Sequence, residues 1–312
     1  MIQNFSLFNP SQTAHPVIRK FCCSSRQVLV RSLSDSENSL RLGYSYTVTE
    51  RDKQHFRENG YVHLKGVLSE EEMDSLEEIY NGFLNKQLVD PSKLGKDFCD
   101  MSGDYNRPLS EFNIINIMLP SKYYPPLKGN LYEQRSASIA EQLCGEDMVM
   151  DYDQLLAKPP LKPEAVFHWH QDLAYWPVTS DTRTASFWLA VDDSNEENGC
   201  IRFVPGSHRE PQLRPHLPLH GDREKSHTLV SKLRPSDQFV PAVLKRGDVT
   251  VHHERVVHGS GGNTTKTSWR RAYVIAYRSQ STVDEERRMG FTHSHNDAVE
   301  VLNEVGKEKL NS

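Results

Sequence analysis

From about residue 148 onward the chain is a succession of short β-prone segments, separated by turn-forming residues and without long helical patterns between them. Strands of this length with Gly, Pro, Asn and Asp breaks are typical of antiparallel sandwiches and barrels. The sequence therefore predicts an all-β core of the jelly-roll kind. The expected strands cover residues 149–158, 165–169, 184–191, 200–204, 242–244, 248–252 and 272–278.

The part of the chain before residue 148 carries helix signals. Thr49 and Gly60 are typical start and stop residues for a helix over residues 49–59, and a strand is expected over residues 61–67. Ser69 opens a second helix, and residues 132–144 form a third that ends at Gly145, whereas residues 90–130 show no regular pattern. We expect these N-terminal helices to support the β core.

The first 34 residues contain four basic side chains and no acidic one. This composition is typical of an organellar import segment, and a disordered tail explains it equally well. Residues 1–44 are therefore expected to be a targeting or disordered segment, and residues 45–312 a single domain. The protein is expected to be soluble and intracellular, in the cytoplasm or, after import, in a mitochondrion or plastid.

Overall composition excludes several classes of protein. A net charge of −5 argues against a nucleic-acid partner, and the longest apolar runs, such as residues 114–119, are too short to span a membrane. The five cysteines are odd in number, and none are spaced as CxxC. A disulfide framework or a cysteine zinc site is therefore not expected. The cysteine pattern instead indicates that the protein resides in a reducing compartment.

Pairs of His and an acid two residues apart are the chemical signal in this chain. Such a pair on one strand, together with a distant His, can supply the three facial ligands of Fe(II). Chance predicts about two such pairs at this composition, and the chain has five: His170/Asp172, His208/Glu210, His220/Asp222, His252/Glu254 and His295/Asp297.

Context separates His170/Asp172 from the other four pairs. It follows the strand-like residues 165–167 and precedes an aromatic cluster. The other pairs lie in loops, polar stretches or turns, or are not followed by an aromatic cluster. Further along the chain, His258 follows the apolar pair Val256-Val257 and precedes a glycine-rich turn. It is therefore the expected third ligand. Arg270 opens the next strand, where its guanidinium can bind the far carboxylate of a 2-oxoglutarate whose keto-acid end chelates the metal.

Several segments, in order over roughly residues 45–280, resemble the phytanoyl-CoA dioxygenase family of Fe(II)- and 2-oxoglutarate-dependent oxygenases. They are residues 61–68, 155–160, 170–177, 198–208, 245–249 and 258–263 with Arg270. The resemblance implies a double-stranded β-helix, a cupin-like jelly roll. It also implies an enzyme that hydroxylates an aliphatic carbon of a small organic substrate with O2 and releases succinate and CO2.

The resemblance also assigns roles to single residues. It gives His170, Asp172 and His258 as iron ligands, and its 2-oxoglutarate contacts are Arg270, Gln171, Trp188, Ser260 and Gln154. Arg271 is the alternative to Arg270, because the loop after His258 is about one residue longer than in some members. An upstream lysine of some members has no clear counterpart, and this region offers Asn113 and Asn116 instead.

The carboxylate Asp172 bears on the outcome of the reaction. Related oxygenases that halogenate lack this carboxylate, so the resemblance implies hydroxylation or a desaturation. Ascorbate is a candidate for keeping the iron reduced. Tyr175, Trp176 and residues 90–125 are expected to contact the substrate, and His253 is expected to support the ligands.

Two other functions remain compatible with these residues. One is a non-redox, cupin-like metalloenzyme that binds zinc or manganese through the same ligands, and the other is a non-catalytic β-sandwich binding protein. The substrate of an oxygenase could be an acyl-CoA, a lipid or a natural-product intermediate. His168 lies on the same side of its strand as His170 and is expected to be a structural or substrate contact.

Overall fold

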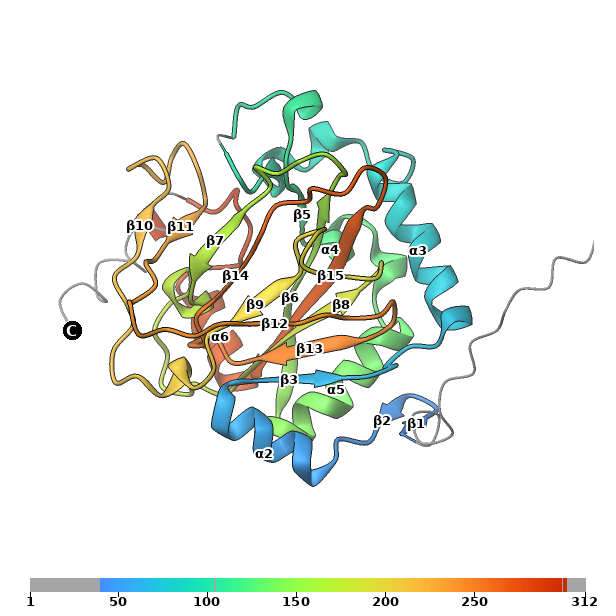
Figure 1. Ribbon diagram of the computed structural model, residues 1–312, viewed down its shortest axis with the longest axis vertical. Helices are drawn as coiled ribbons and strands as arrows, with labels where there is room; N and C mark the ends of the chain where they lie inside the picture. The colour runs from blue at the N-terminus through green and yellow to red at the C-terminus, as the bar shows by residue number, and fades with distance from the viewer. Residues whose placement is uncertain (1–39, 104, 299, 302–312) are drawn as a thin grey trace, which may run out of the picture. The chain divides into compact units, whose positions relative to one another are not determined.

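Two antiparallel sheets dominate this computed structural model, which describes residues 40–103, 105–298 and 300–301 (Figure 1). The larger sheet has the order β3 (Tyr61–Leu64), β13 (Val249–His252), β8 (Thr184–Ala190), β15 (Arg270–Ser279), β6 (Met148–Lys158), β5 (Ile115–Met118), β4 (Phe98–Asp100). The smaller has the order β12 (Val240–Pro241), β9 (Ile201–Phe203), β14 (His258–Ser260), β7 (Phe167–His170). The predicted antiparallel β core with N-terminal helices is confirmed.

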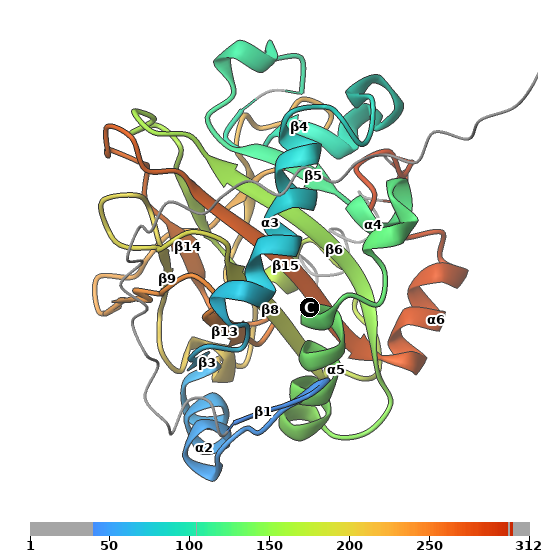
Figure 2. The ribbon, with the colours of Figure 1, turned by 90° about the vertical axis from the view of Figure 1, so that its right-hand side faces the viewer.

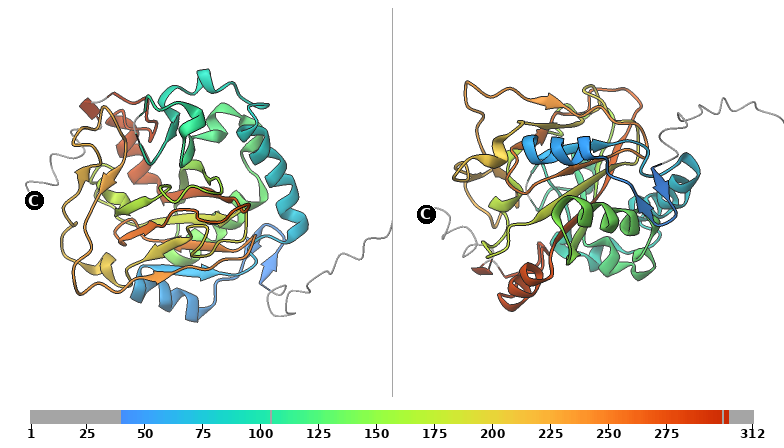
Figure 3. Two further views of the ribbon diagram at one scale, coloured as in Figure 1. Left: turned by 45° about the horizontal axis from the view of Figure 1, so that its top comes forward. Right: turned by 90° about the horizontal axis from the view of Figure 1, so that it is seen from below.

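The N-terminal helices begin and end where their capping residues predict. Thr49 and Asp52 form a reciprocal capping box at the start of α2 (Glu50–Asn59), which ends at Gly60 in the left-handed region (φ 78°). Ser69 opens α3 (Glu70–Leu84) with a second capping box, and Gly145 follows α5 (Leu131–Cys144). The helix α2 lies along β3 at the edge of the large sheet (Figure 3).

The large sheet has one face toward the helices and one toward the small sheet. The helices α3 and α5 cover its outer face, as Figure 2 shows. Because side chains alternate along a strand, odd-numbered residues such as Tyr273 and Ile275 of β15 pack against the helices. Even-numbered residues such as Val274 of β15 and Trp188 of β8 lie on the opposite face, which borders the pocket described below.

Some elements differ from the prediction. Residues 90–130 contribute β4 and β5 to the large sheet, although their short length leaves no clear alternation. The expected strand 242–244 is reduced to a hydrogen bond from the backbone nitrogen of Ala242 to the carbonyl of Ile201 and a single bridge of Leu244 with Ser194, and the strand β12 lies just before it. The elements that had not been predicted include the hairpin of β10 (Leu217–Pro218) with β11 (Leu229–Val230), and α6 (Gln280–Arg288).

The segment proposed for targeting lies largely outside the described residues. Inside them, β1 (Arg41–Leu42) and β2 (Ser45–Tyr46) form a hairpin, so regular structure begins a few residues before position 45. Among the described helices, none is both long and apolar enough to cross a bilayer. Cys99, Cys144 and Cys200 are free thiols.

Candidate metal centre and active-site pocket

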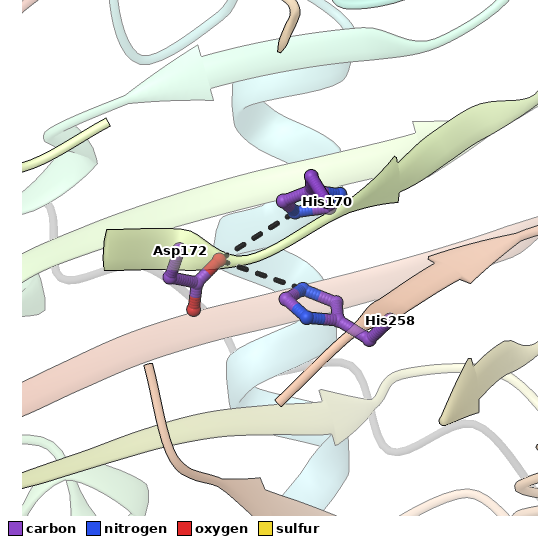
Figure 4. A group of neighbouring side chains, drawn as sticks. All are labelled: His170, Asp172 and His258. Carbon is purple, nitrogen blue, oxygen red and sulfur yellow. Dashed lines mark ion pairs between the residues drawn. The ribbon is translucent and has the colours of Figure 1, made fainter. Parts of the chain in front are cut away.

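The side chains of His170, Asp172 and His258 meet at one point between the two sheets (Figure 4). His170 ends β7 and lies directly opposite His258 of β14 in the antiparallel pairing. Asp172 follows in a short 3-10 turn, and its Oδ1 lies 3.5 Å from His170 Nε2 and 3.4 Å from His258 Nε2. One potential ligand atom from each of the three residues therefore lies within 4.8 Å of the others.

Backbone carbonyls fix the orientation of both imidazole rings. His170 Nδ1 donates to the carbonyl of His168 (2.7 Å), and His258 Nδ1 donates to that of Val256 (3.0 Å). Each Nε2 is thereby left as a lone-pair donor that faces Asp172. Metal-binding histidines are typically oriented in this way, with the second ring nitrogen held by a hydrogen bond.

The second oxygen of Asp172 is held by the large sheet. Asp172 Oδ2 accepts hydrogen bonds from Ser186 Oγ (3.1 Å) and from His252 Nε2 (3.2 Å), which are neighbours across β8 and β13. His253 had been expected to support the ligands, but its side chain points the other way along the strand and contacts His208. The supporting histidine is therefore His252.

Electrostatics keep these groups in the protonation states that a metal requires. Burial lowers the pKa of His258 well below its usual range, which favours the uncharged ring. Burial opposes ionisation of Asp172, but the neighbouring imidazoles, His258 foremost, outweigh it and hold the pKa of the carboxyl well below its usual range. Neutral imidazole and carboxylate are the forms that bind divalent metals.

A glycine allows the strands that carry the two histidines to lie close together. A Cβ on Gly259 would lie 2.9 Å from the carbonyl oxygen of Phe167 and 3.2 Å from the amide nitrogen of Trp169. The sequence had predicted a turn directly after His258. Instead the residues after His258 continue as β14, and Gly259 is required by close approach to β7.

The three side chains line one pocket that lies between the two sheets. It encloses about 910 Å³ of empty space, part of it open to solvent. Four of the five predicted 2-oxoglutarate contacts also line it: Gln154, Trp188, Ser260 and Arg270. The expected substrate contacts Tyr175 and Trp176 do so as well, together with Met101 and Met118 from the region 90–125.

Arg270 is buried in this pocket, and no acidic side chain of the described residues pairs with it. Its side chain is 2% exposed, its Nε has no hydrogen-bond acceptor, and its guanidinium carbon lies 5.3 Å from the ring centroid of Trp188. Burial lowers the pKa of Arg270 to about 10, so it stays charged at neutral pH. A buried, unpaired guanidinium is costly for the protein, which indicates that an anion belongs beside it.

Lys158 is a second buried cation at this end of the pocket, and the sequence prediction missed it. Its Nζ donates to Ser260 Oγ (2.6 Å) and to the carbonyl of Gly261 (2.6 Å), and it lies opposite Arg270 in the pairing of β6 with β15. Burial and the charge of Arg270 lower the pKa of Lys158 well below its usual range. The signal was a lysine directly after the apolar residues 155–157 at the end of β6.

Gln171 does not lie in the pocket, contrary to the expectation from the resemblance. It stands between two residues that face the site, so the alternation of the strand turns it to the opposite side. There its side-chain amide donates to the carbonyl of Arg255 (2.6 Å) and accepts from the backbone nitrogen of Arg214 (2.9 Å).

The alternative residues for the cosubstrate lie elsewhere too. Arg271 faces the outer side of the large sheet, where it pairs with Asp192 and Glu77. Asn116 accepts a hydrogen bond from Gln154 (2.6 Å), and Asn113 donates to Ser102 (3.2 Å). Arg270 is thus the arginine that reaches the pocket.

A second group of metal-ligand residues is already neutralised by arginines. Asp151, Glu286 and His293 also bring ligand atoms within 4.8 Å of one another. Arg287 pairs with Asp151, and Arg278 pairs with Glu286, in each case by a short contact. These ion pairs fill the place of a cation, which distinguishes this group from the one at His170.

Known proteins resemble this chain over most of its length. The family model for phytanoyl-CoA dioxygenase matches residues 56–272. A 2-aminoethylphosphonate dioxygenase of an uncultured bacterium is 29% identical over 78% of this chain and 86% of its own length. The zebrafish (Danio rerio) phytanoyl-CoA dioxygenase domain-containing protein 1 is 25% identical over 76% of this chain and 92% of its own.

A solved structure shows the same likeness. The protein EvdO2 from Micromonospora carbonacea var. aurantiaca, crystallised with 2-oxoglutarate, matches with a TM-score of 0.59 and 28% identity. The match covers 75% of this chain and 92% of that one.

Proposed function

This chain belongs to the phytanoyl-CoA dioxygenase family and is a 2-oxoglutarate-dependent dioxygenase, and we propose that it hydroxylates an aliphatic carbon of a small organic substrate. In the proposed reaction one atom of O2 enters the substrate as hydroxyl and the other enters succinate, while 2-oxoglutarate loses CO2. The observation that carries this proposal is the convergence of two imidazoles and one carboxylate in a pocket that also holds an arginine without an acidic partner among the described residues.

The donor set fits Fe(II). His170, Asp172 and His258 would hold the ion through Nε2, Oδ1 and Nε2, on one side of the pocket. Two imidazoles and one carboxylate with open positions are the typical ligands of non-haem iron oxygenases. Iron bound there would supply the activation of O2 that couples decarboxylation of 2-oxoglutarate to oxidation of a C–H bond.

The role of Arg270 follows from its charge and position. Its fork would bind the far carboxylate of 2-oxoglutarate by two charge-assisted hydrogen bonds, while the keto-acid end points to the metal. Trp188 restricts the guanidinium from one side, and the hydroxyl of Ser260, held by Lys158, can donate to the same carboxylate. Gln154, fixed by Asn116, is placed to contact the cosubstrate.

The sheet topology supports a double-stranded β-helix, and we include this architecture in the proposal. Each of the two sheets is antiparallel, and the metal-binding strands β7 and β14 belong to the smaller one. The arginine and the two residues that hold Asp172 belong to the larger one. The pocket therefore lies between the two layers, as in a jelly roll that encloses its ligand.

The deciding experiment measures succinate formed from 2-oxoglutarate by the purified protein, with and without Fe(II). We expect slow turnover without substrate and faster, Fe(II)-dependent turnover with the correct one among acyl-CoAs, free acids and natural-product scaffolds. His170→Ala should abolish both metal binding and turnover. Turnover that persists in that variant, or equal turnover with Zn²⁺, would contradict the proposal and favour another metal chemistry.

A further inference from the structure

Three histidines that line the pocket and one arginine beside Tyr175 form a group that we call the basic wall: His227, His293, His295 and Arg223. His227, His293 and His295 line the pocket directly. Arg223 stands next to them, with its guanidinium carbon 5.7 Å from the ring centroid of Tyr175. Among the described residues, Asp172 of the metal centre is the only acidic side chain that lines the pocket.

A continuous stack of rings joins the basic wall to the metal centre. The edge of Tyr175 contacts the ring of His170 (5.6 Å between centroids), and His227 stacks on Tyr175 at 5.1 Å. His295 stacks in turn on His227 at 3.9 Å. A group bound against this stack would therefore lie in the same cavity as the reacting carbon.

Two side chains of the basic wall have buried nitrogens without partners. Nε and Nη2 of Arg223 have no hydrogen-bond acceptor, nor does Nδ1 of His227, and no ion pair of the described residues involves Arg223. Burial lowers the pKa of Arg223. Leaving buried donors and a buried charge unpaired is costly, so their retention indicates a ligand that completes them.

Three other buried arginines of this protein are paired with acids. Arg278 contacts Glu254 and Glu286, Arg135 contacts Glu72, and Arg214 contacts Glu210 and Asp237. Arg270, which faces the cosubstrate end of the pocket, is unpaired as Arg223 is. Arg202 also lacks an acid among the described residues, but the rings that it contacts, Trp169 and Phe239, do not line the pocket, whereas Tyr175 beside Arg223 does.

The loop that carries Arg223 is fastened in place. The carbonyl of Lys225 accepts from the backbone nitrogen of Tyr105 (2.9 Å), and Thr228 Oγ1 donates to the carbonyl of Met101 (2.6 Å). The hydroxyl of Tyr175 accepts from the backbone nitrogen of Leu229 (2.8 Å). The basic wall is therefore preorganised, which lowers the entropic cost of binding a ligand.

We propose that the substrate of this enzyme is an organic anion whose carboxylate or phosphonate group is bound by Arg223 and His227 of the basic wall. The inference rests on the proposed function and names the substrate class of the same site. Arginine forms bidentate, charge-assisted hydrogen bonds with both kinds of group. The aliphatic part of the substrate then extends along Tyr175 toward His170 and the metal.

The test uses small anions as probes and calorimetric titration as its measurement. Butyrate and methylphosphonate are titrated separately into the anaerobic protein, loaded with Fe(II) and saturated with 2-oxoglutarate so that the site at Arg270 is filled. We expect one binding site for at least one probe, and the probe that binds identifies the acidic group. Arg223→Met should weaken this binding at least tenfold, and Arg223→Lys, which keeps the charge, should weaken it less.

Lys225→Met is the matched control, because it removes the same charge from an exposed position on the same loop. It should leave probe affinity within about twofold of that of the wild type, since exposed charges are largely screened. Without a probe, Arg223→Met should melt no lower than the wild type, because an unpaired buried charge has been removed.

Two results would overturn the inference. One is that neither probe binds to a protein that still binds 2-oxoglutarate. The other is that Arg223→Met lowers the melting temperature but leaves probe affinity unchanged, which is the behaviour of a structural arginine. Succinate formation is measured separately, so a failure of the dioxygenase proposal is seen as absent turnover even where Arg223-dependent binding of the anion persists.

Discussion

Lys158 lies directly opposite Arg270 in the pairing of β6 with β15, so two buried basic side chains lie side by side on the pocket face of the large sheet. Positive charges on both would repel each other in the low-dielectric interior, which contributes to the lowered pKa of Lys158, and no acidic side chain of the described residues pairs with either one. A carboxylate that enters the pocket would relieve this repulsion. The pair therefore forms an anion site that is set before the cosubstrate arrives.

Lys158→Met should weaken the binding of 2-oxoglutarate. The substitution removes one of the two cations and also releases the hydroxyl of Ser260, which accepts from Lys158 at 2.6 Å. We expect the dissociation constant to rise by about tenfold or more, measured by calorimetry on the Mn(II)-loaded protein. Lys266→Met, at an exposed position, is the control, and an unchanged affinity in Lys158→Met would show that Lys158 is only structural.

Ser186→Ala should weaken metal binding without unfolding the protein. Ser186 donates to Asp172 Oδ2, and hydrogen bonds to a ligand of this kind typically account for about 10- to 100-fold in metal affinity. Fe(II) or Mn(II) titration followed by fluorescence or calorimetry measures the change. Ser194→Ala removes a hydroxyl that is equally buried but has no partner, so its metal affinity should equal that of the wild type. Equal losses in both variants would count against the role of Ser186.

Gly259→Ala should displace His258. The added methyl group would lie 2.9 Å from a backbone oxygen of β7, and backbone atoms cannot move aside as a flexible side chain can. We expect a loss of about 1–3 kcal/mol in the free energy of unfolding, together with weaker metal binding. Gly261→Ala is the matched control, because the nearest atom to its Cβ would be 3.9 Å away, on the flexible Arg202. Denaturant titration and metal titration of the two variants should differ clearly.

The metal-free protein should lose stability as the pH falls from about 6.5 to about 4. Burial lowers the pKa of His253 and of His295 to about 4. In this window the unfolded chain binds protons at both positions and the folded protein does not, so acid favours unfolding. Each group contributes roughly 1–3 kcal/mol. Thermal melts across this range should show a shallower decline for His253→Gln, whereas His55→Gln, at an exposed position, should follow the wild type.

The parts of the fold that could be predicted are those with local signals. Helix starts are marked by the capping side chains of Thr49 and Ser69, and helix ends by the glycines Gly60 and Gly145. The structure places the helix boundaries at these residues. The strands β4 and β5 are three and four residues long, so the pairing of β5 with β6 and of β4 with β5 is decided by tertiary contacts and not by their own pattern.

The same distinction holds for the site. His170, Asp172 and His258 could be selected because strand alternation and an aromatic sequel distinguish their segment. That alternation also excludes Gln171 from the pocket, whereas the resemblance to the family had implied that it contacts the cosubstrate. The positions of His252, Lys158 and Arg223 at the site depend on contacts with residues on other strands or loops. The sequence around each of the three does not indicate which residues these are.

The attachment of the three metal-centre residues has a mechanical consequence. His170 and His258 belong to the small sheet, whereas Asp172 is held by Ser186 and His252 of the large sheet. An ion bound by all three would therefore act as a cross-link between the two layers. Loss of the ion should let the layers separate more often, which would appear as faster amide hydrogen exchange along β7 and β14 and would make the metal-free protein the form most readily cleaved by proteases.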